Sequence, residues 1–188
     1  LRQDVRIILP AYTEVLENME RTRCMARLDM PQGEVRILMG DLPGSSVKVW
    51  LVDYPPFFAR TGNPYLGPDG KPWPDNAERF DLFCRVIVEI AMKRTRLKWK
   101  PDVIHCNDWQ TGLVPPLLED EKNRPATIFT IHNLAYQGLF PYSEFVTLGL
   151  PEKLWSYEYL EFHGHLSFIK GGLVFADKIT AVSPSYAE

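Results

Sequence analysis

The stretch Ala126-Thr-Ile-Phe-Thr-Ile-His-Asn-Leu-Ala-Tyr-Gln-Gly138 changes character abruptly at its middle. Its first six residues are all apolar or β-branched, which is typical of a strand buried on both faces of a parallel sheet. From His132 onward most of the residues are polar or small. In open α/β sheets, ligands bind just beyond the carboxyl ends of the strands. We therefore expect His132 and Asn133 to lie at a ligand-binding edge of the sheet.

The segments on either side of this strand alternate between helix and strand patterns. Asp75-Asn-Ala-Glu78 has the form of a capping box, with Asp75 as the N-cap. The expected order is helix 76–98, strand 101–106, helix 109–119, strand 127–131, helical pieces 143–148 and 151–160, helix 166–176, and strand 177–182. Such alternation predicts an α/β fold, with a parallel sheet and helices on its faces.

The first third of the chain reads differently. Residues 5–9 predict a strand, and residues 13–20 a short helix or an irregular crossing. Residues 34–39 and 46–53 alternate polar and apolar side chains around a turn, which predicts a hairpin or neighbouring edge strands. Residues 54–75 are rich in Pro, Gly and aromatic residues. We expect a long functional loop there, because disordered segments lack aromatics.

Composition limits the classes of function. The chain has 188 residues, enough for one domain with a core, and a net charge of −3. This charge gives no support for binding to nucleic acid or to an anionic membrane. No apolar run is long enough to cross a bilayer. Three widely spaced cysteines argue against a disulfide framework and fit a reducing cytosol.

One basic run, residues 93–100, allows two interpretations. It could be a nucleic-acid or membrane patch. We favour cations at a helix C-terminus, where they complement the helix dipole.

Both ends of the sequence predict a piece of a longer chain. There is no initiating Met, and a strand pattern begins almost at once. The last residues, Ser183-Pro-Ser-Tyr-Ala-Glu188, look like the start of a helix, with Pro184 in the first turn.

Three expected strands end in polar residues: His105 to Asp108, His132 with Asn133, and Ser183. If the strands are parallel neighbours, these side chains gather at one edge of the sheet. Imidazole, amide and carboxylate groups can bind the hydroxyls of a sugar, while aromatic rings pack on its C–H face. Such rings are offered by Trp73, Trp109 and Tyr136. The alternative is that Asp108 and Asn133 only cap helices and turns.

The other motifs give weaker support for a functional site. His163-Gly-His165 could place two imidazoles on one face, but a metal site would need a third ligand, so we favour surface or packing histidines. No Walker loop, G-x-G-x-x-G or G-x-S-x-G motif is present. Gly171-Gly172 fits close packing of a helix against the sheet better than a phosphate loop.

The sequence resembles the family of bacterial glycogen synthases and plant starch synthases. The resemblance rests on five runs in the same order, which cover essentially the whole chain: Pro74-Asp-Asn-Ala-Glu-Arg-Phe80, Pro101-Asp-Val-Ile-His-Cys-Asn-Asp-Trp109, Thr130-Ile-His-Asn-Leu-Ala-Tyr-Gln-Gly138, Leu166-Ser-Phe-Ile-Lys-Gly-Gly172 and Ala176-Asp-Lys-Ile-Thr-Ala-Val-Ser-Pro-Ser-Tyr186.

The resemblance implies a retaining glycosyltransferase of the GT-B type, built from two Rossmann-like halves around a cleft. This chain would be most of the N-terminal, acceptor-side half. The donor would be ADP-glucose, the partner an α-1,4-glucan, and no metal or other cofactor would be needed. The family's Lys-Thr-Gly-Gly-Leu donor loop would precede residue 1, and the phosphate-binding residues would belong to the second half. The location would be cytoplasmic, or the plastid stroma for a plant-type enzyme.

Residue by residue, the resemblance implies that His132 and Asn133 are the catalytic, sugar-facing pair. Asp108 would lie near the acceptor glucan, in the family's Asp-Trp pair with Trp109. Trp73 stands where many members carry Tyr, and Gln110 where they often carry His. Tyr136 and Gln137 complete the candidate substrate-binding residues.

Three questions stay open from sequence: glycogen or starch as product, ADP-glucose or UDP-glucose as donor, and the oligomeric state. Rival interpretations are a non-catalytic glucan-binding domain, or another retaining GT-B transferase such as a sucrose synthase relative.

Overall fold

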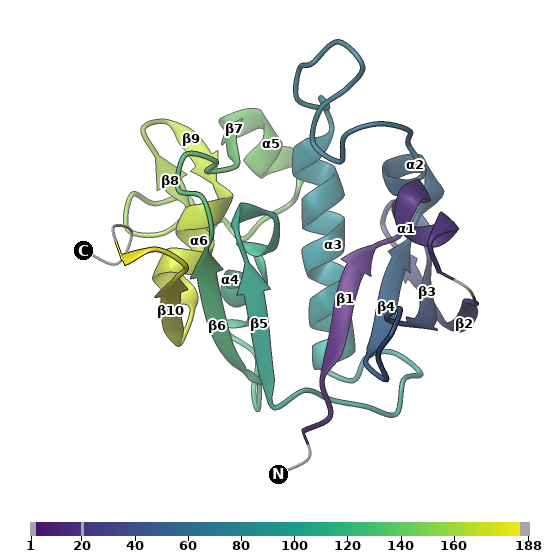
Figure 1. Ribbon diagram of the computed structural model, residues 1–188. Coiled ribbons are helices and arrows are strands. Elements are labelled where there is room, and N and C mark those ends of the chain that lie inside the picture. Colours follow the sequence, from purple (N-terminus) through teal and green to yellow (C-terminus); the bar gives the residue numbers. More distant parts are fainter. Residues whose placement is uncertain (1–2, 20, 185–188) are drawn as a thin grey trace. The chain divides into compact units, whose positions relative to one another are not determined.

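The computed structural model describes residues 3–19 and 21–184 (Figure 1). The chain forms two compact units, residues 1–76 with 93–98 and residues 77–92 with 99–188. Each unit contains its own sheet. The helix start expected at the end of the sequence falls largely on residues 185–188, outside the described part.

The first unit is built on a mixed four-stranded sheet of order β1-β4-β3-β2. Its strands are β1 (Arg6–Pro10), β2 (Arg23–Met30), β3 (Gly33–Asp41) and β4 (Lys48–Asp53). β1 pairs parallel with β4, and the other pairs are antiparallel. The expected first strand and the β3–β4 pair are confirmed, whereas β2 was not predicted. Its sequence shows little alternation of apolar and polar residues, because only Ala26 and Leu28 of its eight residues are buried.

Short helices and loops complete this unit. α1 (Thr13–Glu17) packs Val15 and Leu16 against a small core that includes Val49 and Leu51 of β4. The long segment after β4 begins with α2 (Pro55–Phe58), and the rest of it is irregular up to Asp75.

α3 (Asn76–Ala91) is shorter than expected. It was predicted to reach about Lys98, but Lys93 adopts a left-handed φ of 56°, which ends the helix. The basic run after it therefore lies outside the last helical turn, and its assignment to the helix C-terminus was wrong. The capping role of Asp75 was also wrong, since the hydrogen bonds of its carboxylate come from Arg60.

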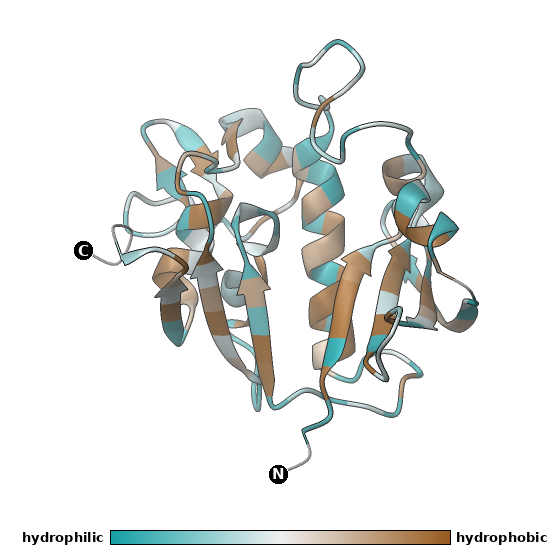
Figure 2. Cartoon of the chain, viewed as in Figure 1, coloured by the Kyte–Doolittle hydropathy of each residue, from teal (hydrophilic) through white to brown (hydrophobic). Residues whose placement is uncertain are grey.

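The second unit contains the predicted parallel sheet, in the order β10-β6-β5. The strands are β5 (Val103–Asn107), β6 (Ala126–Ile131) and β10 (Lys178–Ala181). Both pairs are parallel. Figure 2 shows β5 changing from hydrophobic colour at its start to hydrophilic colour at its end. β6, whose side chains are apolar or β-branched on both faces, is the central strand, as its composition predicts.

Glycines bring α6 (Phe168–Phe175) close to this sheet. A Cβ at Gly172 would lie 2.3 Å from the ring of Phe129 on β6. A Cβ at Gly171 would lie 2.5 Å from the carbonyl oxygen of Gly112. The close helix packing predicted for the Gly-Gly pair is therefore confirmed.

The expected helix 109–119 is divided into η1 (Trp109–Thr111) and α4 (Val114–Leu118). Pro115 lies in the first turn of α4, where its missing N–H costs no helical hydrogen bond. The sequence predicted that the prolines would shorten or kink this helix, and the division agrees with that.

The remaining elements are short. A second sheet of order β7-β9-β8 contains β7 (Leu139–Pro141), β8 (Glu161–Phe162) and β9 (His165–Ser167). α5 (Tyr142–Thr147) is confirmed, but only η2 (Glu152–Leu154) is helical in the segment 151–160. In the described part of the chain, no helix has the length and apolar character needed to cross a membrane.

Candidate functional site

Polar residues gather at the carboxyl ends of the three parallel strands. β5 ends at Asn107, β6 at Ile131 and β10 at Ala181, and the strands are adjacent (Figure 1). The arrows of all three point to the same edge of this sheet in Figure 1. The gathering expected from the sequence is therefore confirmed for the strand ends that carry Asp108 and His132.

Asp108 fastens the turn after β6 to the turn after β5. One oxygen of its carboxylate, Oδ1, accepts hydrogen bonds from the backbone N–H of His132 at 2.7 Å and of Asn133 at 3.4 Å. Its own N–H donates to the carbonyl of Thr130 at 3.0 Å. Asp108 has φ 56° and ψ −178°, an unusual conformation for a residue with a Cβ. Such conformations cost about 1–3 kcal/mol and persist where surrounding contacts hold them.

His132 lies exposed at the tip of β6. Its ring nitrogen Nε2 lies 3.0 Å from Oδ1 of Asn107, the last residue of β5. Asn107 belongs to the polar strand end expected from the sequence, His105 to Asp108, but it was not among the candidate site residues. Its position at the end of β5, next to Asp108, could have indicated this contact. That position became informative only once β5 was known to lie beside β6.

Asn133 shapes the loop after His132. Its side-chain Oδ1 accepts from the N–H of Ala135 at 3.0 Å, and its carbonyl accepts from the N–H of Tyr136 at 3.2 Å. This is the turn-forming role that the sequence left open as an alternative. The Nδ2 group of Asn133 points to no partner within the described residues, so it can still donate to a ligand.

The loop closes against the start of α6. The carbonyls of Gln137 and Gly138 accept from the N–H groups of Ile169 and Phe168, at 3.1 and 3.0 Å. Gly138 has φ 60°, and a Cβ there would lie 2.4 Å from the ring of Trp109. Only glycine meets both conditions. Tyr136 remains 66% exposed between these fixed points.

Comparison with known proteins assigns the chain to a family. The sequence profile described as "Starch synthase catalytic domain" matches residues 1–188. The chain belongs to the starch synthase catalytic domain family.

Named relatives agree with this assignment. Glycogen synthase 1 of Methylococcus capsulatus is 60% identical over 188 residues, which are 100% of this chain and 38% of that protein. Glycogen synthase of Thioalkalivibrio sulfidiphilus is 56% identical over 190 residues, covering 100% and 39%. The chain thus spans about two fifths of the length of these curated relatives.

A solved structure shares the fold. The catalytic domain of starch synthase IV from Arabidopsis thaliana, bound to ADP and acarbose, superposes with a TM-score of 0.79 at 29% identity. The match covers 98% of this chain and 38% of that one. The Rossmann-like, parallel-sheet architecture of a GT-B half is therefore confirmed for this chain.

Trp109 does not present the flat face that we expected. It is only 8% exposed. Its ring packs against Phe80, Phe140 and Phe168, with centroid distances of 4.9, 6.0 and 6.2 Å. These rings and Gly138 enclose the indole, so Trp109 supports the loop from below rather than offering a stacking surface.

Trp73 belongs to the first unit. The guanidinium of Arg60 lies 4.7 Å from the centre of its ring, and the indole N–H donates to the carbonyl of Asn63 at 3.1 Å. The side chain is half-buried. One face of the predicted stacking surface is therefore already covered by a cation.

The candidate metal pair does not gather further ligands. Nδ1 of His165 lies 3.0 Å from the carbonyl of His163, and His163 and Gly164 form the turn between β8 and β9. Within the described residues, no three His, Cys, Asp or Glu side chains lie close enough together to hold a metal ion.

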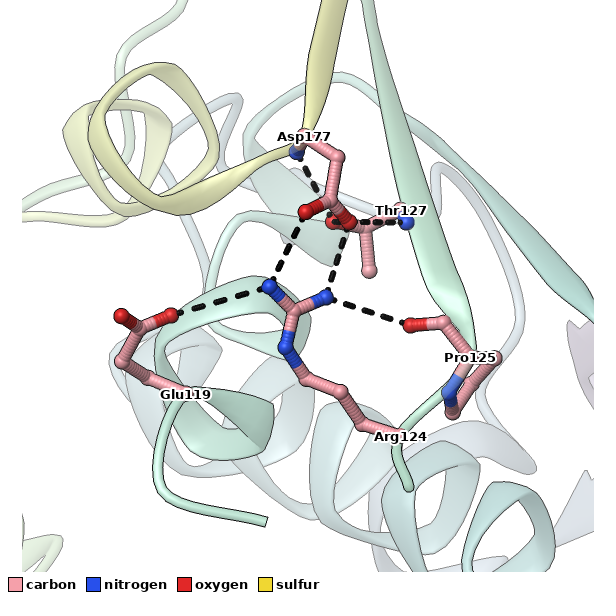
Figure 3. A network of polar contacts seen from close by, with 5 residues as sticks. All are labelled: Glu119, Arg124, Pro125, Thr127 and Asp177. Carbon is pink, nitrogen blue, oxygen red and sulfur yellow. Dashed lines mark hydrogen bonds and ion pairs between the residues drawn. The ribbon is translucent and has the colours of Figure 1, made fainter. Parts of the chain in front are cut away.

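A cavity of about 690 Å³ lies in the second unit and is lined by residues of α4, η2 and α6 and of the segments that precede β6 and β10. Beside it, Arg124 forms two hydrogen bonds with the carboxylate of Asp177, at 2.8 and 3.0 Å (Figure 3). Asp177 also accepts from the backbone N–H of Thr127 at 2.7 Å and from its hydroxyl at 3.0 Å. Lys153 forms an ion pair with Asp120. Both basic side chains of this cavity are thus engaged by carboxylates, and the polar contacts serve to join the starts of β6 and β10.

Proposed function

We propose that the protein containing this chain transfers glucose from ADP-glucose to the non-reducing end of an α-1,4-glucan, with retention of configuration. The chain would supply the acceptor-side half of the active site. Its membership of the starch synthase family, with His132 and Asn133 at the carboxyl end of the central strand, is the observation that carries this proposal. The names of the bacterial relatives and the ADP and acarbose bound to the plant structure support it.

The tip of β6 offers groups suited to a sugar. Nδ1 of His132, Nδ2 of Asn133 and the side chain of Gln137 can bind hydroxyls, while the exposed ring of Tyr136 can pack on a sugar face. The transition state of glucosyl transfer carries positive charge on the sugar. We expect fixed dipoles of the His132 side chain and of neighbouring carbonyls to stabilise that charge. The substrate-binding roles expected for Asp108 and Trp73 belong to this proposal, whereas the buried Trp109 supports the loop instead.

The nucleotide donor acts as a substrate, so the proposal needs no resident metal or cofactor. It includes a cytoplasmic location, because the relatives named above are bacterial and Cys24, Cys84 and Cys106 are all free thiols. We also propose that the 188-residue chain has no activity by itself, since the ADP moiety of the donor would bind mainly to the other half of the enzyme. Extension of glycogen by the isolated chain with ADP-glucose would refute that point.

The test is turnover of radiolabelled ADP-glucose by the full-length protein with glycogen as acceptor. His132→Ala should lower kcat by at least about 100-fold, in the range for loss of a transition-state dipole. His165→Ala is the matched control, because within the described residues this exposed histidine bonds to the carbonyl of His163 and not to the residues at the strand ends, so kcat should stay unchanged. If His132→Ala stays within a few-fold of wild type, the assignment of His132 is wrong. If wild type binds glucan without turnover, the rival glucan-binding domain is favoured.

A further inference from the structure

Asn107 makes a contact to the proposed catalytic histidine that the function described above does not use. We propose that Asn107 is a positioning residue that holds the proton of the neutral His132 ring on Nε2 and turns the Nδ1 lone pair toward a sugar hydroxyl. This inference rests on the proposed function of His132 for its catalytic meaning, but the tautomer itself can be tested without any activity.

The orientation of the Asn107 amide is fixed by its second contact. Its Nδ2 group donates to the backbone carbonyl of His105, at 3.3 Å. A carbonyl oxygen can only accept, so the amide nitrogen must face His105 and the amide oxygen must face His132. The oxygen lies 3.0 Å from Nε2 of His132.

This orientation decides which ring nitrogen carries the proton. An amide oxygen accepts and cannot donate, so Nε2 of His132 must be the donor. In the neutral imidazole the other nitrogen, Nδ1, is then an acceptor. Nδ1 makes no hydrogen bond to any residue that the structure describes, and the ring is exposed, so its lone pair is available to a ligand.

Hydrogen bonds also hold the backbone around Asn107 and His132. The carbonyl of Asn107 accepts from the hydroxyl of Thr111 at 3.0 Å, and Asn107 is in register with Thr130 in the β5–β6 pair. The charged group of the same turn, Asp108, directs its carboxylate to the N–H of His132. Two consecutive residues therefore fix the histidine at both ends, Asp108 at its backbone and Asn107 at its ring.

Without Asn107, an exposed imidazole divides between two tautomers and two ring orientations. Only one of these four arrangements places a lone pair toward the ligand and an N–H toward β5. We expect Asn107→Ala to lower kcat on the order of tenfold, in line with the cost of misplacing a reacting group. KM should change less, because both ends of the Asn107 amide are already engaged by His105 and His132.

The direct test is ¹⁵N NMR of the histidine side chains in the full-length protein, with His132 assigned by comparison with His132→Ala. Wild type should show a protonated Nε2 and an unprotonated Nδ1, and Asn107→Ala should show exchange between tautomers. Asn107→Asp keeps an acceptor oxygen and should retain the Nε2–H form. A protonated Nδ1 in wild type, or an unchanged spectrum in Asn107→Ala, would overturn the inference.

Kinetics separate positioning from a general structural effect. If Asn107 acts through His132, Asn107→Ala should have no further effect in the His132→Ala background, whereas an equal loss in both backgrounds would refute the role. Absence of glucosyl transfer by wild type would refute the proposed function and leave the NMR result to decide the tautomer.

Discussion

Replacing Asp177 by Asn should loosen the start of the parallel sheet. Arg124 and the backbone N–H and hydroxyl of Thr127 all donate to this carboxylate, whose hydrogen bonds range from 2.7 to 3.0 Å. Asn at this position keeps one acceptor but loses the charge and the two-point pairing with Arg124. Charge-assisted hydrogen bonds contribute about 1.5–3 kcal/mol when buried. The Asp177 side chain is 39% exposed, so solvent screening reduces the expected loss to about 1–2 kcal/mol.

The loss should depend on pH in a defined direction. The hydrogen bonds from Arg124 and from the Thr127 amide hold the pKa of Asp177 well below its usual range. A carboxylate with a lowered pKa in the folded state stabilises the fold above its unfolded-state pKa of about 3.9 and loses that contribution as the pH falls. The difference between wild type and Asp177→Asn should therefore be constant from pH 5 to 8 and shrink below about pH 4.

Amide hydrogen exchange of the full-length protein measures this local stability. Peptides covering β6 and β10 should exchange about 5- to 30-fold faster in Asp177→Asn at pH 7, since 1.4 kcal/mol corresponds to tenfold. Asp120→Asn is the matched control, because Asp120 pairs with Lys153 while 75% exposed and such pairs contribute little. Equal protection of β6 in wild type and Asp177→Asn at pH 7, or a difference that does not begin to shrink as the pH falls below about 4, would refute the reasoning.

Two further predictions concern packing and thiol reactivity. Gly172→Ala should destabilise the contact between α6 and β6 by about 1–3 kcal/mol through overpacking against Phe129, measured by exchange of β6 amides, and retained protection would show that the helix can shift away. Burial raises the pKa of the Cys84 thiol well above its usual range and that of Cys106 to about 12. Brief alkylation at pH 8 followed by peptide mass mapping should therefore modify exposed Cys24 and spare both, and labelling of either in native protein would contradict their burial.

The parallel sheet and its polar edge were predictable because short stretches of consecutive residues determine both. β6 is a short apolar run followed at once by His132, and this pattern needs no knowledge of distant residues. The close approach of α6 was likewise signalled by two adjacent glycines. In each case a single physical requirement, burial on both faces or lack of a Cβ, selects the residue type.

The details that were missed depend on contacts between distant segments. The burial of Trp109 results from Phe80, Phe140 and Phe168, which are far from it and from one another in the sequence. The partnership of Asn107 with His132 requires β5 beside β6, which the sequence alone did not show. β2 was overlooked because an edge strand with two buried residues has too little apolar alternation to be recognised.

The loop that follows β6 is anchored at both ends, and this has a use in protein engineering. Asp108 holds the backbone N–H groups of its first two residues, while Gly138 packs against the ring of Trp109 and accepts a hydrogen bond from the start of α6. Leu134, Ala135 and Tyr136 are exposed between these anchors, and Gln137 is half-buried. Because both anchors lie outside residues 134–136, these three positions can be randomised to change what the loop binds while the fold is kept.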